Sequence, residues 1–140
     1  MNIYLCIILL ALLLEFLLYN LSHYLDLKNL TTELPSEFKG YYKPEEYARS
    51  QEYIRVNSRF SHITSTINLL IILLVISLGI FNTVDLWLRG FGYSPLVTGI
   101  LFFGFLFFIQ DILGTPFSVY QTFIIEEKFG FNKTTPKTYI

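Results

Sequence analysis

Three long apolar stretches alternate with shorter polar segments along the chain. The apolar stretches cover residues 3–25, about 63–88 and about 96–125. A helix needs roughly 20 apolar residues to cross the hydrocarbon core of a bilayer, because each residue advances about 1.5 Å and unpaired backbone groups cannot be hydrated there. The pattern therefore predicts an all-α integral membrane protein with three transmembrane helices and the lipid bilayer as its surroundings.

The second span is predicted to continue from a long polar helix that lies outside the membrane. Pro44, followed by two glutamates, makes a good helix start. An apolar stripe with three- and four-residue steps then runs without a breaker into the span: Tyr53, Val56, Phe60 and Ile63. The predicted helices are therefore about 3–25, 44–88 and 96–128, with a helical extension before the second span.

Proline and glycine mark the predicted breaks between these helices. Residues 34–40 contain Pro35 and Gly40, which favours an extended turn. Residues 89–95 contain two glycines and end at Pro95, which is suited to open the third helix. The second and third helices are therefore predicted to form an antiparallel hairpin, and Pro116 allows the long third helix to kink.

The positive charges assign a side of the membrane to each polar segment, since Lys and Arg in short loops favour the cytoplasm. The link 89–95 has only Arg89. The other two polar segments hold nine basic residues: Lys28, Lys39, Lys43, Arg49, Arg55, Arg59, Lys128, Lys133 and Lys137. We therefore expect an outside or lumenal amino terminus, and a first loop, helical extension and carboxyl end in the cytoplasm.

The first span is not predicted to be a removable secretory signal. No Lys or Arg precedes it, Glu15 lies inside it, and no small-x-small cleavage site follows it. The formal net charge of −1 gives no strong field and does not favour nucleic acid as a partner. Cys6 is the single cysteine, so neither an intramolecular disulfide nor a multi-cysteine metal cluster is expected.

Two carboxylates lie deep in predicted spans, Glu15 in the first and Asp111 in the third, beside Gln110. Such groups cost several kcal/mol in lipid unless they face protein, water or a partner. In one interpretation these side chains line a polar or water-filled interior. In the other, they are protonated or hydrogen-bonded to another helix and only fix the packing, and the residues alone do not decide between the two.

A catalytic zinc site needs several converging ligands, and the chain offers few. His23 and His62 are its two histidines, and neither belongs to an H-E-x-x-H motif, in which two imidazoles one helical turn apart hold zinc beside a glutamate base. Both histidines are predicted at span boundaries, where ordinary packing is the simpler interpretation. No nucleophile is assigned.

The carboxyl-terminal segment carries several boundary signals. The third helix is expected to leave the bilayer near Glu126, Gly130 is suited to cap it, and Thr135 followed by Pro136 is typical of a new helix start. Only four residues follow Pro136, too few for a stable helix. We therefore expect the chain to be truncated.

This segment carries a family resemblance. It is similar to the signature of the CAAX prenyl protease 1 membrane metalloproteases, and further matches in order are 34–38, 47–50 and 99–103. The signature residues are Pro116, Phe117, Ser118, Glu126, Glu127, Phe129, Gly130, Phe131, Asn132, Lys133, Thr134, Thr135 and Pro136.

The resemblance implies that residues 1–140 are the amino-terminal transmembrane domain of a multi-span zinc endopeptidase that cleaves carboxyl-terminal CAAX-type peptides. It implies an endoplasmic-reticulum or bacterial inner membrane, a large intramembrane chamber that Glu15, Gln110 and Asp111 would face, and peptide or prenylated-peptide substrates. The zinc ligands and catalytic glutamate would lie in the remainder of the parent, so this fragment would hold no zinc and be inactive alone. The alternative is a complete, non-catalytic three-span assembly or scaffold protein.

Overall fold

The computed structural model describes residues 2–38, 40–41 and 43–139, and all secondary structure in these residues is helical. This confirms the all-α prediction. The elements are α1 (Ile3–Asn29), the 3-10 turn η1 (Ser36–Phe38), α2 (Pro44–Ser77), α3 (Ile80–Arg89), α4 (Pro95–Tyr120), the π-helix η2 (Gln121–Glu126), α5 (Glu127–Phe129) and α6 (Pro136–Tyr139).

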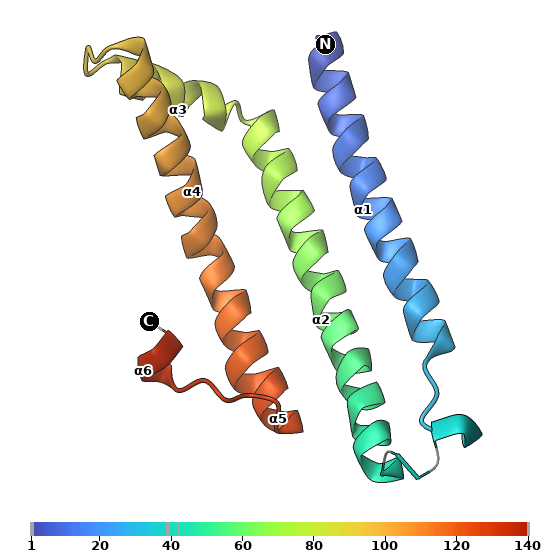
Figure 1. The fold of residues 1–140 in the computed structure, drawn as a ribbon. Helices are drawn as coiled ribbons and strands as arrows, with labels where there is room; N and C mark the ends of the chain where they lie inside the picture. The colour runs from blue at the N-terminus through green and yellow to red at the C-terminus, as the bar shows by residue number, and fades with distance from the viewer. Residues whose placement is uncertain (1, 39, 42, 140) are drawn as a thin grey trace.

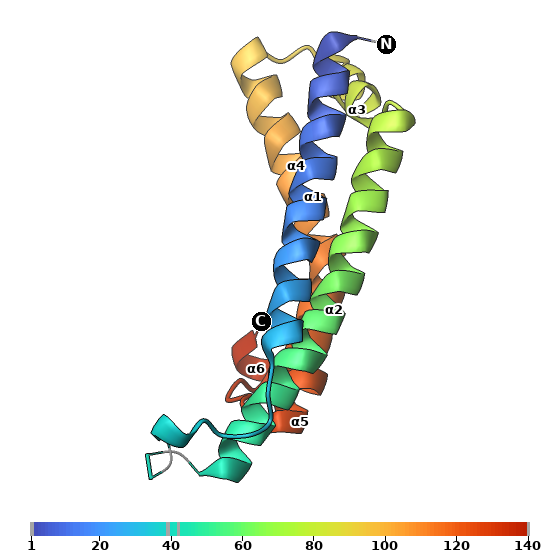
Figure 2. The ribbon, with the colours of Figure 1, turned by 90° about the vertical axis from the view of Figure 1, so that its right-hand side faces the viewer.

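The three longest helices run side by side, with α2 between α1 and α4 (Figure 1). The view turned by 90° shows one elongated body (Figure 2). Helix α1 packs against α2. The segments η2 and α5, which follow α4, contact the part of α2 that includes Tyr53 and Asn57. Among the described residues, the helices long and apolar enough to cross a membrane are Ile3–Asn29, Pro44–Ser77 and Pro95–Phe129. Three spanning helices are thus confirmed, although the second ends at Ser77 and not near Leu88, and the chain is an integral membrane protein.

The prediction of one continuous helix over 44–88 is wrong. Helix α2 ends at Ser77, and Gly79 adopts a left-handed backbone with φ of +65°. Glycine enters this region at little cost, whereas L side chains rarely do, so the chain can turn sharply here. Helix α3 then runs across the ends of α2 and α4 (Figure 1). The sequence did not predict this break, because Gly79 is a single glycine within an apolar stretch.

The proline boundaries are confirmed, since α2 begins at Pro44, α4 at Pro95 and α6 at Pro136. Helix α1 continues to Asn29, four residues beyond its predicted end. Pro116 lies inside α4 without ending it. The π-helical segment that follows α4 was not predicted. In the predicted turn 34–40, η1 forms over Ser36–Phe38 and Lys39 lies outside the described residues.

Few apolar side chains are shielded within this chain. Among the described residues the buried hydrophobic side chains are Leu88, Ile125 and Phe129. Large apolar residues such as Leu10 and Phe107 are mostly exposed on the spans. A surface of this kind suits lipid or further helices, because neither requires a polar exterior.

Candidate functional site

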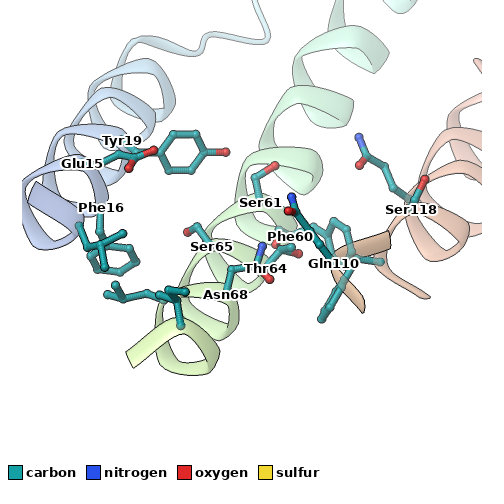
Figure 3. A pocket seen from close by; sticks show the side chains of 15 residues that line it. Glu15, Phe16, Tyr19, Phe60, Ser61, Thr64, Ser65, Asn68, Gln110 and Ser118 are labelled. Atoms are coloured by element: carbon teal, nitrogen blue, oxygen red, sulfur yellow. The ribbon is translucent and has the colours of Figure 1, made fainter. Parts of the chain in front are cut away.

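A hollow of about 680 Å³ lies between α1, α2 and α4. Figure 3 shows side chains from these three helices around it. The volume is within the range of small-ligand sites in proteins. The lining residues are Leu12, Glu15, Phe16, Tyr19, Phe60, Ser61, Thr64, Ser65, Asn68, Leu69, Ile72, Gln110, Phe117, Ser118 and Gln121.

Helix α2 contributes a polar stripe to the hollow. Ser61 is three and four residues from Thr64 and Ser65, and Asn68 is four and three residues from the same two, which places all four on one side of the helix. Thr64 Oγ1 donates to the Phe60 carbonyl at 3.0 Å, and Ser65 Oγ donates to the His62 carbonyl at 2.9 Å. The hydroxyl protons of Thr64 and Ser65 are thus hydrogen-bonded within the helix, while their oxygens can still accept a hydrogen bond from a molecule bound in the hollow.

The hollow brings together two of the three polar residues singled out from the sequence. Glu15 reaches it from α1 and Gln110 from α4. Asp111 does not line this hollow and is exposed elsewhere on α4. Consecutive residues of an α-helix point about 100° apart, and of these two only Gln110 is turned toward the hollow. That Asp111 faces a larger chamber remains a prediction.

At the end of the hollow nearest η2, side chains of α2 make contacts that the sequence did not reveal. Gln121 Nε2 donates to Asn57 Oδ1 at 3.1 Å and so joins η2 to α2. The ring of Phe60 stacks on Tyr120, with centroids 5.1 Å apart, and lies 6.5 Å from the ring of Phe117. Asn57 and Gln121 are 64 residues apart, and no local pattern links them.

Near this end of the hollow, the signature segment after η2 packs against α2 and forms a junction with it. Phe129 is 6% exposed, and the Tyr53 ring lies 5.6 Å from it and 4.9 Å from Phe131. Gly130 ends α5 in the left-handed conformation with φ of +72°, which confirms its predicted capping role. The Glu126 carbonyl then accepts from the backbone of Phe131 at 2.9 Å, so the chain reverses tightly.

The rest of the signature fixes the segment that leads to α6. Asn132 Nδ2 donates to Glu127 Oε2 at 3.0 Å, and Asn132 Oδ1 accepts from the Thr134 backbone at 2.7 Å. Tyr139 donates from its hydroxyl to Ser118 Oγ at 2.6 Å, which ties α6 back to α4. In this chain these signature residues therefore make structural contacts.

The described residues do not fit a zinc site. Among them, no group of three or more His, Cys, Asp and Glu side chains converges, whereas zinc sites use three or four protein ligands. His62 contacts the Asn20 amide oxygen through Nδ1. The His23 ring packs 4.4 Å from Tyr19, and its shielded Nδ1 has no hydrogen-bond partner among the described residues.

Apolar spans around a polar hollow define a class of helical membrane proteins with a polar interior. Residues 23–140 match the family described as CAAX prenyl protease N-terminal, five membrane helices. The chain belongs to this family. Three helices of spanning length occur in the described residues, compared with five in the family description.

Individual relatives agree with this assignment. The chain is 35% identical over 119 residues to the CAAX prenyl protease 1 homolog of Dictyostelium discoideum. This alignment covers 81% of this chain and 28% of that protein. It is 30% identical to CAAX prenyl protease 1 of Saccharomyces cerevisiae over 78% of this chain and 26% of that protein. The chain thus spans between a quarter and a third of these relatives' length.

A solved structure has the same fold. S. mikatae Ste24p aligns with a TM-score of 0.84 and 26% identity, over 98% of this chain and 33% of that chain. The arrangement of the helices described above is therefore similar to that of the matching part of Ste24p.

Proposed function

We propose that residues 1–140 form the amino-terminal transmembrane domain of a zinc-dependent CAAX prenyl endopeptidase and part of the wall of its intramembrane chamber. The observation that supports this most is the polar stripe of α2, which faces a hollow at the depth of the spans. Polar side chains within a membrane usually face a cavity or another helix. Here Ser61, Ser65 and Asn68 line a space large enough for a guest.

In this proposal the hollow guides a peptide, and the rest of the parent supplies the chemistry. Asn68 and Gln110 each carry an amide that both donates and accepts, which suits the alternating N–H and C=O groups of an extended peptide. Glu15 would attract a positive group or share a proton with the guest. Zinc, held by residues of the parent beyond this chain, would polarise the scissile carbonyl and activate water.

The proposal includes an orientation. The end of the molecule with the α1–α2 loop and α5 would lie in the cytoplasm, and the amino terminus and the α3–α4 link outside. The basic residues that support this are concentrated at the former end, including Lys28, Lys43 and Lys128. The first turns of α2 would then form the cytoplasmic helical extension.

Solvent access to the hollow tests the chamber. In the full-length parent with Cys6→Ser and its other reactive cysteines replaced, Ser65→Cys should react with a membrane-impermeant thiosulfonate. The control is Phe107→Cys in α4, at a residue that is 69% exposed and that we expect to face lipid. We expect at least about tenfold faster labelling at position 65, because a thiol in hydrocarbon stays protonated and unreactive. Equal rates at the two positions would contradict the proposal.

Peptide cleavage tests the guiding role. In the full-length parent, Gln110→Ala should raise KM for a CAAX-type peptide by about two- to tenfold with little change in kcat, since one hydrogen bond contributes about 0.5–1.5 kcal/mol. Asp111→Asn, one residue further along α4 and outside this hollow, is the matched control. A parent without peptidase activity would instead favour the non-catalytic assembly protein.

A further inference from the structure

Helix α3 lies where two membrane spans end. It begins three residues after α2 ends at Ser77 and is followed by α4, which begins at Pro95. Both views show it running across the long helices instead of along them (Figures 1 and 2). Its 10 residues extend about 15 Å, half the thickness of the hydrocarbon core. The helix is therefore too short to span the hydrocarbon core, and it lies beside the ends of two helices that can.

The side chains of α3 divide into three faces. Leu88 is 5% exposed and anchors the face that packs on the protein. Ile80 and Trp87, seven residues apart, form an exposed apolar face. The third face carries three polar side chains at helical spacing: Asn82, Asp85 and Arg89. The exposed Leu86 lies between this face and the apolar face. Positions two residues apart differ by about 200°, so Trp87 points away from both Asp85 and Arg89.

The apolar face continues into an aromatic cluster after the helix. The Trp87 ring lies 5.4 Å from that of Phe91, and Phe91 stacks 6.1 Å from Tyr93. All three rings are more than half exposed. Trp and Tyr favour the headgroup level of membranes because their rings are apolar with one polar atom. Leu78, just after α2, and Leu96, at the start of α4, are also exposed.

The polar face is electrically balanced. Arg89 Nε donates to Asp85 Oδ2 at 2.7 Å. This hydrogen bond raises the pKa of Arg89, so the guanidinium stays charged beside its carboxylate. The helix thus offers lipid an apolar surface and a neutral ion pair. Membrane attachment of such a helix depends on buried apolar area when no excess positive charge attracts anionic headgroups.

We infer that α3 is an interfacial helix that docks on the headgroup boundary of the bilayer, with Ile80 and Trp87 in the upper acyl region and Asn82, Asp85 and Arg89 toward water. Its partner is the lipid surface itself, and neutral phosphatidylcholine is sufficient. The helix would hold the α2 and α4 ends at a fixed depth.

Spin labels on single cysteines test this inference in the full-length parent reconstituted in phosphatidylcholine vesicles. Labels at Trp87→Cys and Ile80→Cys should collide mainly with oxygen, at a depth of about 5–10 Å below the headgroups. Labels at Asn82→Cys and Arg89→Cys should collide mainly with a water-soluble nickel chelate. Two positions on each face keep the result clear if one variant does not fold.

Three results would overturn the inference. Depth that changes steadily from residue 80 to residue 89 would mean that α3 crosses the bilayer. Low collision with both reagents at positions 80 and 87 would mean that protein, such as another helix or a second copy, covers this face. Docking that requires added phosphatidylserine would mean that charge, and not apolar area, drives attachment.

Discussion

Two neighbouring parts of α2 differ in how they pack. Near Tyr53 and Asn57 the helix meets η2 and the signature segment through ring contacts and the hydrogen bond to Gln121. About two turns further on, Ser65 and Asn68 of the same helix line the hollow. Tight packing at one end can hold neighbouring helices at a fixed angle, so the middle remains open although three spans surround it. The signature residues Phe129 and Phe131 belong to the packed part, whereas Phe117 and Ser118 line the hollow.

The largest expected effect is at the centre of the junction. Phe129→Ala removes a 6% exposed ring that contacts Tyr53, and core Phe→Ala substitutions cost about 3–5 kcal/mol. We expect a loss of this size in the free energy of unfolding, measured by denaturant titration in detergent micelles. Phe107→Ala, on an exposed position of α4, should change it by less than about 1 kcal/mol. Similar losses at both positions would remove the distinction between junction and surface.

A smaller effect is expected from the turn that closes the junction. Gly130→Ala forces an L residue to φ of +72° and should cost about 1–2 kcal/mol. An added Cβ would meet nothing nearer than Arg49 Nη1 at 3.9 Å, so backbone strain and not a clash is the cause. Gly99→Ala in α4 is the matched control, because its Cβ meets open space and alanine favours helix. A control variant as unstable as Gly130→Ala would rule out this explanation.

Much of the architecture was predictable from local chemistry. The three spans follow from apolar length, and the starts of α2, α4 and α6 follow from prolines at residues 44, 95 and 136. The cap at Gly130 follows from the need for positive φ at a helix end. These features depend on a few consecutive residues, which is why the sequence alone carries them.

The features that were not predicted depend on contacts between residues distant in sequence, or on local patterns that are compatible with more than one structure. Gly79 turns the chain within an apolar run, although a lone glycine is also compatible with a continuous helix. The bond between Asn57 and Gln121 requires a particular approach of two helices. Glu15, Gln110 and Asp111 were predicted as candidates because they lie far inside apolar stretches. Which of Gln110 and Asp111 faces the hollow depends on how α4 is rotated about its axis, and the sequence does not give this rotation.

The hydrogen bond between Asn57 and Gln121 should contribute less to the stability of the packed part than Phe129 or Gly130 does. A double-mutant cycle with Asn57→Ala and Gln121→Ala should give a coupling of about 0.6 kcal/mol, typical of hydrogen bonds between membrane helices. The measurement is again the free energy of unfolding in micelles. The pair Asn57 and Asn68 is a control cycle, because Asn68 lines the hollow and additivity is expected. A coupling near zero for Asn57 with Gln121 would mean that ring packing alone holds η2 against α2.

The smallest change in the free energy of unfolding is expected for a substitution in the hollow. The same substitution in the packed part of α2 provides a direct comparison. Ser58 and Ser65 are seven residues apart on one helix face, but Ser58 is 5% exposed whereas Ser65 lines the hollow. Ser65→Val adds volume where space exists, so the free energy of unfolding should change by less than about 0.5 kcal/mol. Ser58→Val adds the same atoms to a packed site and should cost about 1–3 kcal/mol. If both substitutions lowered the free energy of unfolding equally, Ser65 would be packed as tightly as Ser58. The hollow would then be closed in the membrane, and the two parts of α2 would not differ.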